Sequence, residues 1–222
     1  MDRAALPEGT KAQLGGWDFR FHRGPSSVCV VLVHEVFGFD DYSNTVATNL
    51  SKNGFSTIAV DLYQGQHAST LEEAFKLRQS LTEPQVLNCL SSGAQFLRTK
   101  LGAGFKVGTM GFCVGGGYAL LGACSLDLEF CVDYYGSIEN VDKAKGLRGP
   151  VLMMLGSEDE RVTPWAFAQF LPAAMKYKKR VDLQLYPNAK HAFHRPNWEG
   201  HNAEAAADAW AKTLAFLSQF KT

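Results

Sequence analysis

Hydrophobic residues follow two different patterns along this chain. Short continuous apolar runs, rich in β-branched residues, are typical of strands buried on both faces of a parallel sheet. They predict strands at residues 28–33, 56–60, 105–110, 130–135, 151–155 and 181–186, with an alternating edge strand at 17–21. Between these runs, apolar positions recur every three or four residues, which predicts helices at 41–53, 71–79, 82–100, 116–123, 163–177 and 203–220.

Strands that alternate with helices along a chain indicate βαβ units. We therefore expect an α/β fold with a mostly parallel, twisted sheet and helices on both faces. A length of 222 residues suits one domain, which we place at 1–222. Residues 1–16 contain one proline and three glycines, and we expect a loosely ordered lead-in there.

Composition narrows the range of partners. Lysine plus arginine equals aspartate plus glutamate at 22 each, so the formal net charge is zero, which argues against nucleic acid or an anionic membrane. No apolar run approaches the ~18 residues that a membrane-spanning helix needs. Residues 1–11 hold no segment suited to secretion. We therefore expect a small-molecule partner and a monomer or small homo-oligomer.

The five cysteines are odd in number and show neither Cys-x-x-Cys nor zinc-binding spacing, so we expect no metal site. Cys29, Cys124 and Cys131 lie in apolar runs and are predicted to be core thiols. Unpaired core thiols are typical of reducing compartments, and the expected location is cytoplasmic.

One short motif carries the strongest chemical signal. Gly111-Phe112-Cys113-Val114-Gly115 joins a predicted strand to a predicted helix. This is the pattern of a nucleophile elbow, with Cys where Ser is usual, and no Gly-x-Ser-x-Gly occurs elsewhere. Helix amides at such a turn favour both a thiolate and an oxyanion. The alternative is a buried core cysteine beside a glycine-rich turn.

A cysteine nucleophile needs a base, and the base needs a carboxylate that orients it. Functional groups of parallel sheets gather beyond the carboxyl ends of the strands. Asp159 follows the strand 151–155 and His191 follows 181–186, so Cys, Asp and His occur in the order of α/β-hydrolase triads. Glu158 competes with Asp159, and His194 competes with His191.

The remaining histidines fit a catalytic base less well. His22 and His67 lie in early loops and are predicted to face solvent. His34 ends a strand ahead of the nucleophile and is predicted to have a structural or orienting role. His201 lies near the start of the last helix.

Six segments between about residue 28 and the C-terminus share one pattern: His34-Glu35-Val36-Phe37-Gly38, Asp61-Leu62-Tyr63, 111–116, Tyr134-Tyr135-Gly136, Gly156 with Asp159, and 191–195. In these segments the chain resembles the dienelactone hydrolases (carboxymethylenebutenolidases), a family of the α/β-hydrolase superfamily. The resemblance implies the α/β-hydrolase fold and a Cys113–His191–Asp159 triad that forms a thioester acyl-enzyme. It also implies an oxyanion hole made by the backbone amides of Val114 and Val36.

The resemblance gives Glu35 and Arg195 further roles. In the family the glutamate keeps the resting cysteine protected and largely neutral, and an anionic substrate then displaces it. Arg195 matches the arginine that grips the substrate carboxylate. For Glu35 the alternative is a structural carboxylate bonded to loop amides, and for Arg195 it is an exposed side chain.

The chain departs from the family at the second carboxylate-binding arginine, because the segment after Tyr63 is shorter and holds no clear equivalent. Arg78 and Arg161 are candidate replacements, and both could equally be surface charges. Aromatic residues are expected to line the pocket: Phe37, Tyr63, Tyr135, Phe193 and Trp165.

These features together predict a hydrolase of small esters or lactones, with or without a carboxylate on the substrate, that uses no cofactor. One alternative is a non-catalytic relative that binds a small carboxylate or a protein. The intact Cys, Asp and His in the required order argue against it. Another is a redox-reactive cysteine protein, which is disfavoured because no resolving cysteine stands near Cys113 in sequence.

Overall fold

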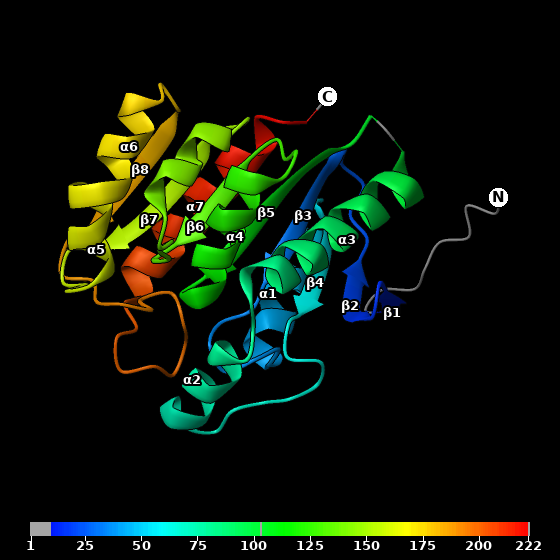
Figure 1. Cartoon of the computed structure of the whole chain (residues 1–222), viewed down its shortest axis with the longest axis horizontal. Coiled ribbons are helices and arrows are strands. Elements are labelled where there is room, and N and C mark those ends of the chain that lie inside the picture. Colours follow the sequence, from blue (N-terminus) through cyan, green and yellow to red (C-terminus); the bar gives the residue numbers. More distant parts are fainter. Residues whose placement is uncertain (1–9, 103, 222) are drawn as a thin grey trace.

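The computed structural model describes residues 10–102 and 104–221. Within these ranges one sheet of eight strands has the order β1-β2-β4-β3-β5-β6-β7-β8 (Figure 1). All neighbouring pairs from β4 to β8 are parallel, whereas β1 and β2 pair antiparallel at one edge. The strands are β1 Thr10–Leu14, β2 Trp17–His22, β3 Val28–Val33, β4 Ser56–Asp61, β5 Lys106–Phe112, β6 Cys131–Tyr134, β7 Val151–Gly156 and β8 Val181–Tyr186.

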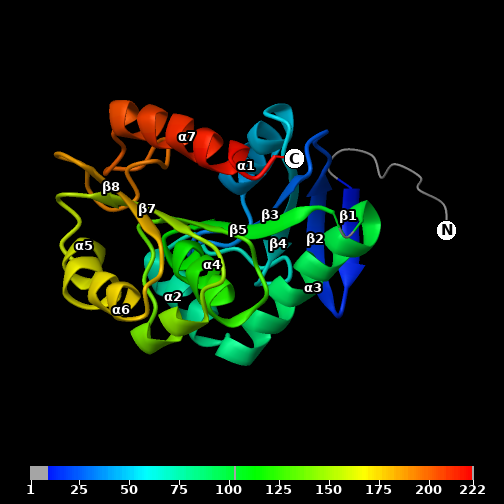
Figure 2. The same cartoon turned by 90° about the horizontal axis from the view of Figure 1, so that it is seen from above.

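Helices cover both faces of this sheet. Seen from above, α1 and α7 lie on one side and α3, α4, α5 and α6 on the other (Figure 2). The helices are α1 Asp41–Lys52, α2 Leu71–Gln79, α3 Glu83–Leu101, α4 Val114–Ser125, η1 Val141–Gly146, α5 Val162–Trp165, η2 Ala166–Phe170, α6 Leu171–Lys176 and α7 Ala203–Ser218. The predicted α/β-hydrolase architecture is confirmed. Among the described helices, none combines the length and apolarity needed to cross a bilayer.

Alternate residues of the central strands feed two separate cores. Along β3, Cys29, Val31 and Val33 face the core beneath α3 and α4, while Val30 and Leu32 face the core beneath α1 and α7. Both sets are buried, which explains why this strand reads as a continuous apolar run. The core thiols predicted at Cys29, Cys124 and Cys131 are buried, and every cysteine is unpaired.

The N-terminal edge differs from the expectation of a loose lead-in. Residues 10–14 form β1, which turns back through Gly15 and Gly16 and pairs with β2. Both glycines have positive φ, so this glycine pair makes a hairpin turn. Residues 1–9 of the predicted lead-in lie outside the described residues.

Two local predictions on this frame are wrong. Strand β2 extends one residue further than expected and pairs His22 with Thr57 of β4, so His22 is buried instead of facing solvent. The helix predicted at 163–177 begins one residue earlier, at Val162, so Thr163 lies within it and its hydroxyl donates to the Gly156 carbonyl. That helix continues through a π-helical turn, η2, to Lys176.

Candidate active site

Cys113 lies at the sharp turn between β5 and α4. Its φ is 55° and its ψ is −122°, a strained conformation for a residue with a side chain and typical of a nucleophile elbow. A side chain at Gly111 would overlap the Gly115 carbonyl, and one at Gly115 would overlap the His34 carbonyl. The turn therefore requires glycine at both positions.

Three side chains meet beyond the carboxyl ends of β5, β7 and β8. Cys113 Sγ lies 3.1 Å from His191 Nε2, and His191 Nδ1 lies 2.6 Å from Asp159 Oδ2. Parallel pairing of β7 with β8 brings the loops after these strands side by side. The residues predicted as nucleophile, base and acid thus form one chain of contacts.

The contacts raise the proton affinity of the imidazole, as a base requires, and favour an ionised carboxylate. Burial lowers the pKa of His191, but its hydrogen bonds to Asp159 and Cys113 outweigh burial and raise the pKa above its ordinary value. Burial raises the pKa of Asp159, but His191 and the amides of Val162 and Arg161 outweigh it, so the pKa of this carboxyl is lowered. An anionic Asp159 stabilises the imidazolium that forms when His191 takes a proton.

The competing residues lie elsewhere. Glu158 is exposed, whereas its neighbour Asp159 is buried against His191. His194 Nδ1 lies 2.7 Å from the Tyr42 hydroxyl, whereas Cys113 Sγ contacts His191. Burial, with a smaller contribution from His201, lowers the pKa of His194 to about 4. Neither rival is placed to act in the predicted triad.

The other histidines are structural or distant. His34 Nδ1 donates a hydrogen bond to the Glu35 carbonyl at 2.6 Å, and His34 Nε2 accepts one from the Leu62 amide at 3.1 Å. These two bonds fit a role in orienting the loop after β3. His67 is exposed, as predicted. His201 Nδ1 lies 3.0 Å from the Phe193 carbonyl.

Two backbone amides are available beside the thiol. Val114 is the first residue of α4, and the amides at a helix start lack acceptors within the helix. Val36 lies in the loop after β3, and both residues line the same cavity as Cys113. No described residue accepts a hydrogen bond from either amide.

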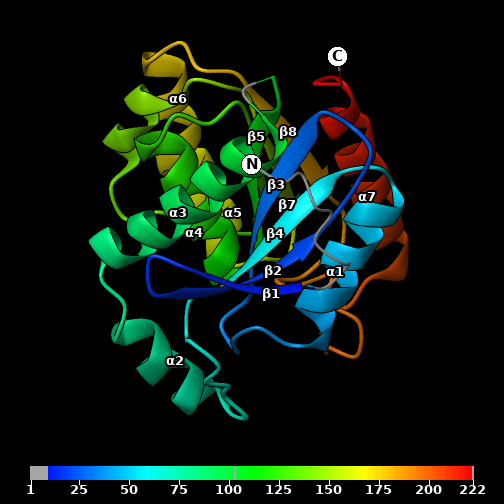
Figure 3. The same ribbon diagram turned by 90° about the vertical axis from the view of Figure 1, so that its right-hand side faces the viewer.

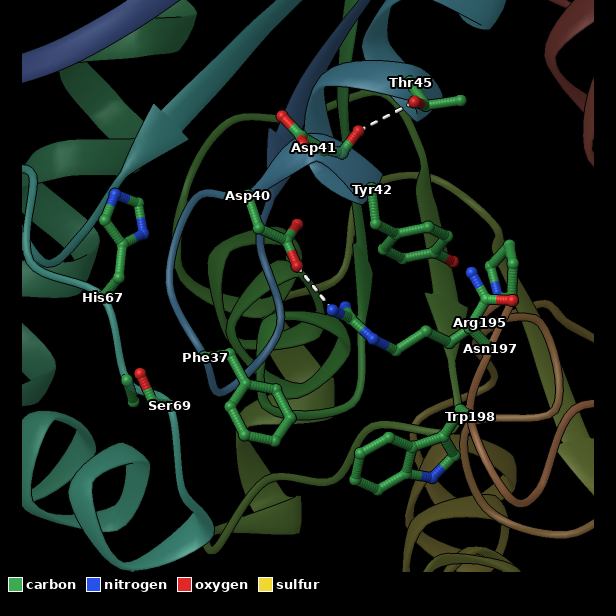
Figure 4. Close-up of a pocket in the computed structure, with 12 residues that line it drawn as sticks. Phe37, Asp40, Asp41, Tyr42, Thr45, His67, Ser69, Arg195, Asn197 and Trp198 are labelled. Atoms are coloured by element: carbon green, nitrogen blue, oxygen red, sulfur yellow. Dashed lines mark hydrogen bonds and ion pairs between the residues drawn. The ribbon is translucent and has the colours of Figure 1, made fainter.

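Glu35 is buried beside the triad and is held by Arg195. Arg195 Nη1 lies 2.5 Å from Glu35 Oε2, and Arg195 Nη2 lies 2.5 Å from Asp40 Oδ2. Figure 4 shows the arginine extended between Phe37 and Tyr42 toward Asp40. Arg195 is therefore neither an exposed arginine nor a free one, because it bridges two carboxylates.

Burial raises the pKa of Glu35, and the charge and hydrogen bond of Arg195 only partly offset it. The second oxygen of Glu35, Oε1, has no hydrogen-bond partner among the described residues. Glu35 also makes no hydrogen bond to Cys113, whose Sγ contacts His191. The resting arrangement implied by the resemblance, with Glu35 holding the thiol, differs from the arrangement in this structure.

A cavity of about 1220 Å³ opens onto the thiol. Among the aromatic residues expected in its walls, Phe37, Tyr135 and Trp165 line it. The predictions for Tyr63 and Phe193 are wrong, because both rings are buried in the two cores. Arg78 and Arg161 both line the cavity, so neither is remote from the site.

A second cavity of about 680 Å³ lies on the other side of Arg195. Phe37, Arg195 and Trp198 line both cavities and separate them. The smaller cavity also contains Asp40, Tyr42 and His67 (Figure 4). Within the described ranges, no three His, Cys, Asp or Glu side chains are grouped as a metal site requires.

Sequence reasoning missed several residues of the site. Asp40 also caps α1, because its side chain accepts a hydrogen bond from the Ser43 amide. This local role does not indicate its contact with Arg195. Trp198 lies in an irregular loop without a periodic pattern. Leu71 and Phe75 occupy one face of α2 with Arg78, and this helical spacing was the available signal.

Comparison with known proteins identifies the family of this chain. The sequence pattern of the Dienelactone hydrolase family matches residues 21–221. Carboxymethylenebutenolidase of Pseudomonas putida is 27% identical over 211 residues, which cover 90% of this chain and 89% of that protein. A probable 2-oxo-3-(5-oxofuran-2-ylidene)propanoate lactonase of a Bradyrhizobium species is 27% identical over 203 residues, 85% of this chain and 82% of the relative.

Solved structures show the same fold. A Klebsiella pneumoniae protein, provisionally named a dienelactone hydrolase, superposes with a TM-score of 0.84 at 26% identity over 91% of this chain and 93% of that chain. Fold, motif positions and relatives agree that this chain is a hydrolase and belongs to the dienelactone hydrolase family.

Proposed function

We propose that this protein hydrolyses small esters or lactones by a cysteine-dependent mechanism in which Cys113, His191 and Asp159 act as nucleophile, base and acid. The observation that carries the proposal is the unbroken contact chain from Sγ through the imidazole to a buried carboxylate. Its position on a strained elbow, beside two amides without acceptors among the described residues, adds the features that acyl transfer requires.

In the proposed reaction the Cys113 proton passes to His191 Nε2 as sulfur attacks the carbonyl carbon. The resulting oxyanion accepts hydrogen bonds from the Val114 and Val36 amides. His191 then protonates the leaving alkoxide, which gives a thioester and an alcohol. A water molecule, deprotonated by His191, attacks the thioester, and the returned proton restores the thiol.

Glu35 and Arg195 are proposed to couple this chemistry to an anionic substrate. A substrate carboxylate competes with Glu35 for the Arg195 guanidinium, which binds carboxylates in a bidentate manner. Loss of its cation raises the proton affinity of the buried Glu35 carboxylate further, so that it helps to accept the thiol proton. The Glu35–Arg195 ion pair and the raised pKa of Glu35 support this role.

The proposed substrate class follows from the family and from the charges of the cavity. Relatives carry the names carboxymethylenebutenolidase and lactonase, and two lining arginines, Arg78 and Arg161, form no ion pair with a described carboxylate. A small lactone or ester, with or without a carboxylate, is compatible with a cavity lined by these two arginines. A cytoplasmic location is part of the proposal and is supported by the unpaired, mostly buried cysteines.

Hydrolysis of p-nitrophenyl acetate and of a dienelactone by wild type, Cys113→Ala and His191→Ala tests the proposal. Both variants are expected to lose at least about 1,000-fold in kcat/KM, because each removes a group that bonds to the reacting atoms or moves the proton. Cys124→Ala, which removes a core thiol, is the matched control and should retain activity. Equal rates for wild type and Cys113→Ala would refute the mechanism.

A further inference from the structure

The cavity beside Cys113 is larger than a small lactone ring requires. Its volume of about 1220 Å³ exceeds the range of roughly 300–1,000 Å³ that is usual for drug-sized ligands. The triad borders only one part of it, and other lining residues belong to α2, α3, α4 and η1. The space therefore extends well beyond the reacting carbonyl.

Helix α4 forms one long wall of this space. Val114, Gly117, Tyr118 and Leu121 line the cavity and recur at helical spacing along one face of α4. At 1.5 Å per residue, Tyr118 lies about 7–8 Å along the helix from Cys113, and Leu121 lies about one turn further. A substrate chain bound at Cys113 thus has an ordered surface along which to extend.

Helix α2 contributes a second set of lining side chains to this cavity. Leu71, Phe75 and Arg78 share one face and line the cavity, and Leu71 and Phe75 are 50% and 42% exposed. Ala74 is the one buried residue of this helix. Figure 3 shows α2 standing apart from the helices that pack on the sheet. The face of α2 that carries Leu71 and Phe75 is therefore turned toward the cavity, whereas Leu77 packs against the core beneath α3 and α4.

The cations of the cavity are not equally available to a ligand. Lys143 pairs with Glu83 at 2.7 Å, and Arg195 is held by Glu35 and Asp40. Arg78 instead lies near Tyr118, a neutral phenol that lines the same cavity, and forms no ion pair with any described carboxylate. A guanidinium in this position is free to accept a carboxylate at the level of Tyr118.

We propose that the substrate of this site is an extended amphiphilic ester whose acyl chain runs from Cys113 along α4, against Phe75, and ends in a carboxylate at Arg78. The inference rests on the proposed ester hydrolysis and adds to it the length and charge of the substrate: the carboxylate of a short substrate is proposed to reach Arg195, and that of a long acyl chain to reach Arg78. The separation of about 7–8 Å between Cys113 and Tyr118 along α4 sets the distance between the two functional groups. Short esters are then poor mimics of the natural substrate.

Two matched series of p-nitrophenyl esters test this inference. The anionic series consists of the hemiesters of succinic, adipic and suberic acid, and the neutral series of the butyrate, hexanoate and octanoate. The ratio of kcat/KM between anionic and neutral esters of equal length is the readout. We expect this ratio to rise by about 10-fold or more from succinate to adipate or suberate, because only the longer chains reach Arg78.

Two substitutions test whether Arg78 and Phe75 cause the expected preference for long anionic esters. Arg78→Gln should lower the ratio for adipate and suberate by about 10-fold, whereas Arg148→Gln, which alters an exposed arginine outside the cavity, should leave it at the wild-type value. Phe75→Ala should lower kcat/KM for the long esters of both series relative to acetate by about 10-fold. Phe167→Ala removes an equally exposed phenylalanine outside the cavity and serves as its control.

The outcomes separate the two proposals. A ratio that does not change with chain length, or an Arg78→Gln variant that matches wild type, overturns the extended substrate. If Cys113-dependent acetate hydrolysis persists in that case, the proposed function stands alone. Hydrolysis that is independent of Cys113 overturns both.

Discussion

Two buried carboxylates, Asp159 and Glu35, lie beside the same cysteine–histidine pair, and they differ in their hydrogen-bond partners. Asp159 and Glu35 are both 3% exposed. Asp159 accepts hydrogen bonds from the amides of Arg161 and Val162 and contacts His191. Glu35 is bound through one oxygen to one cation, Arg195. The exposed fractions are equal, but Glu35 lies deeper in the protein and has fewer hydrogen-bond partners, so both burial and the partners differ between the two sites.

Asp159 is therefore a fixed anion, which stays ionised, and Glu35 is an adjustable anion, whose charge depends on Arg195. The partners of Asp159 outweigh burial, so its pKa is lowered, whereas burial outweighs Arg195 at Glu35, so the pKa of Glu35 is raised. Backbone amides cannot leave Asp159, but Arg195 is already shared with Asp40 and can be drawn to another anion. The triad half of the site is therefore preorganised, and the Glu35 half responds to what enters the cavity.

The largest effect on activity is expected when the fixed anion, Asp159, is removed. Asp159→Asn keeps the shape but cannot stabilise imidazolium, and kcat/KM for p-nitrophenyl acetate should fall by about 1,000- to 10,000-fold. Glu158→Gln, which changes the exposed neighbour, is the matched control and should be close to wild type. Similar losses in the two variants would contradict the assignment of Asp159.

Glu35→Gln removes the adjustable anion and should have a smaller effect, about 10- to 100-fold in kcat/KM. In wild type Glu35 must be ionised to accept a proton, so activity should fall as pH drops through its raised pKa, above the ordinary value of 4.5. The glutamine variant cannot titrate and should lose this acid limb of the pH–rate profile. An acid limb of identical position in both enzymes would exclude Glu35 as its source.

Asp40→Asn tests whether Arg195 is shared. The substitution keeps an oxygen that caps α1 but removes one of the two anions that hold Arg195, so a substrate carboxylate should bind more tightly. KM for the p-nitrophenyl hemiester of succinic acid should fall by about 5-fold, with little change for the neutral butyrate. Asp41→Asn alters the adjacent aspartate and is the control. An increase in KM for the hemiester would disprove the sharing.

The smallest catalytic effect is expected at a third buried carboxyl, Asp133. Burial raises its pKa to about 7, although the Gly136 amide donates to Oδ1 at 2.9 Å. Because the folded pKa lies above the ordinary 3.8, this group favours folding at low pH, and its contribution is lost as pH rises through about 7.

Asp133→Asn removes that titration. Relative to wild type, the variant should gain about 2 kcal/mol in the free energy of unfolding between pH 5 and pH 9, measured by urea denaturation. Asp127→Asn, which changes an exposed carboxylate, should show no such gain. A pH-independent difference for Asp133→Asn would mean that its partners, like those of Asp159, offset burial.

Sequence patterns predicted most of this fold because most of its strands are buried on both faces. Strands β3 and β8 and helix α2 have the predicted bounds, and the other central elements differ by a few residues. The hairpin formed by β1 and β2 was missed because residues 10–16 are short, mostly polar and end in two glycines. Such a segment gains its structure from pairing with the sheet edge and carries no apolar pattern of its own.

The sequence by itself determined the elbow at Cys113 and the chain order of nucleophile, acid and base. Those features are local, because a tight turn demands glycines at fixed spacing and a strand end fixes where a loop begins. Only the tertiary structure decided that Asp159 and not Glu158 reaches His191, that Arg195 is shared with Asp40, and that Arg78 faces the cavity. These contacts join residues up to 155 positions apart, and only packing of the strands and their loops brings such residues within hydrogen-bond distance.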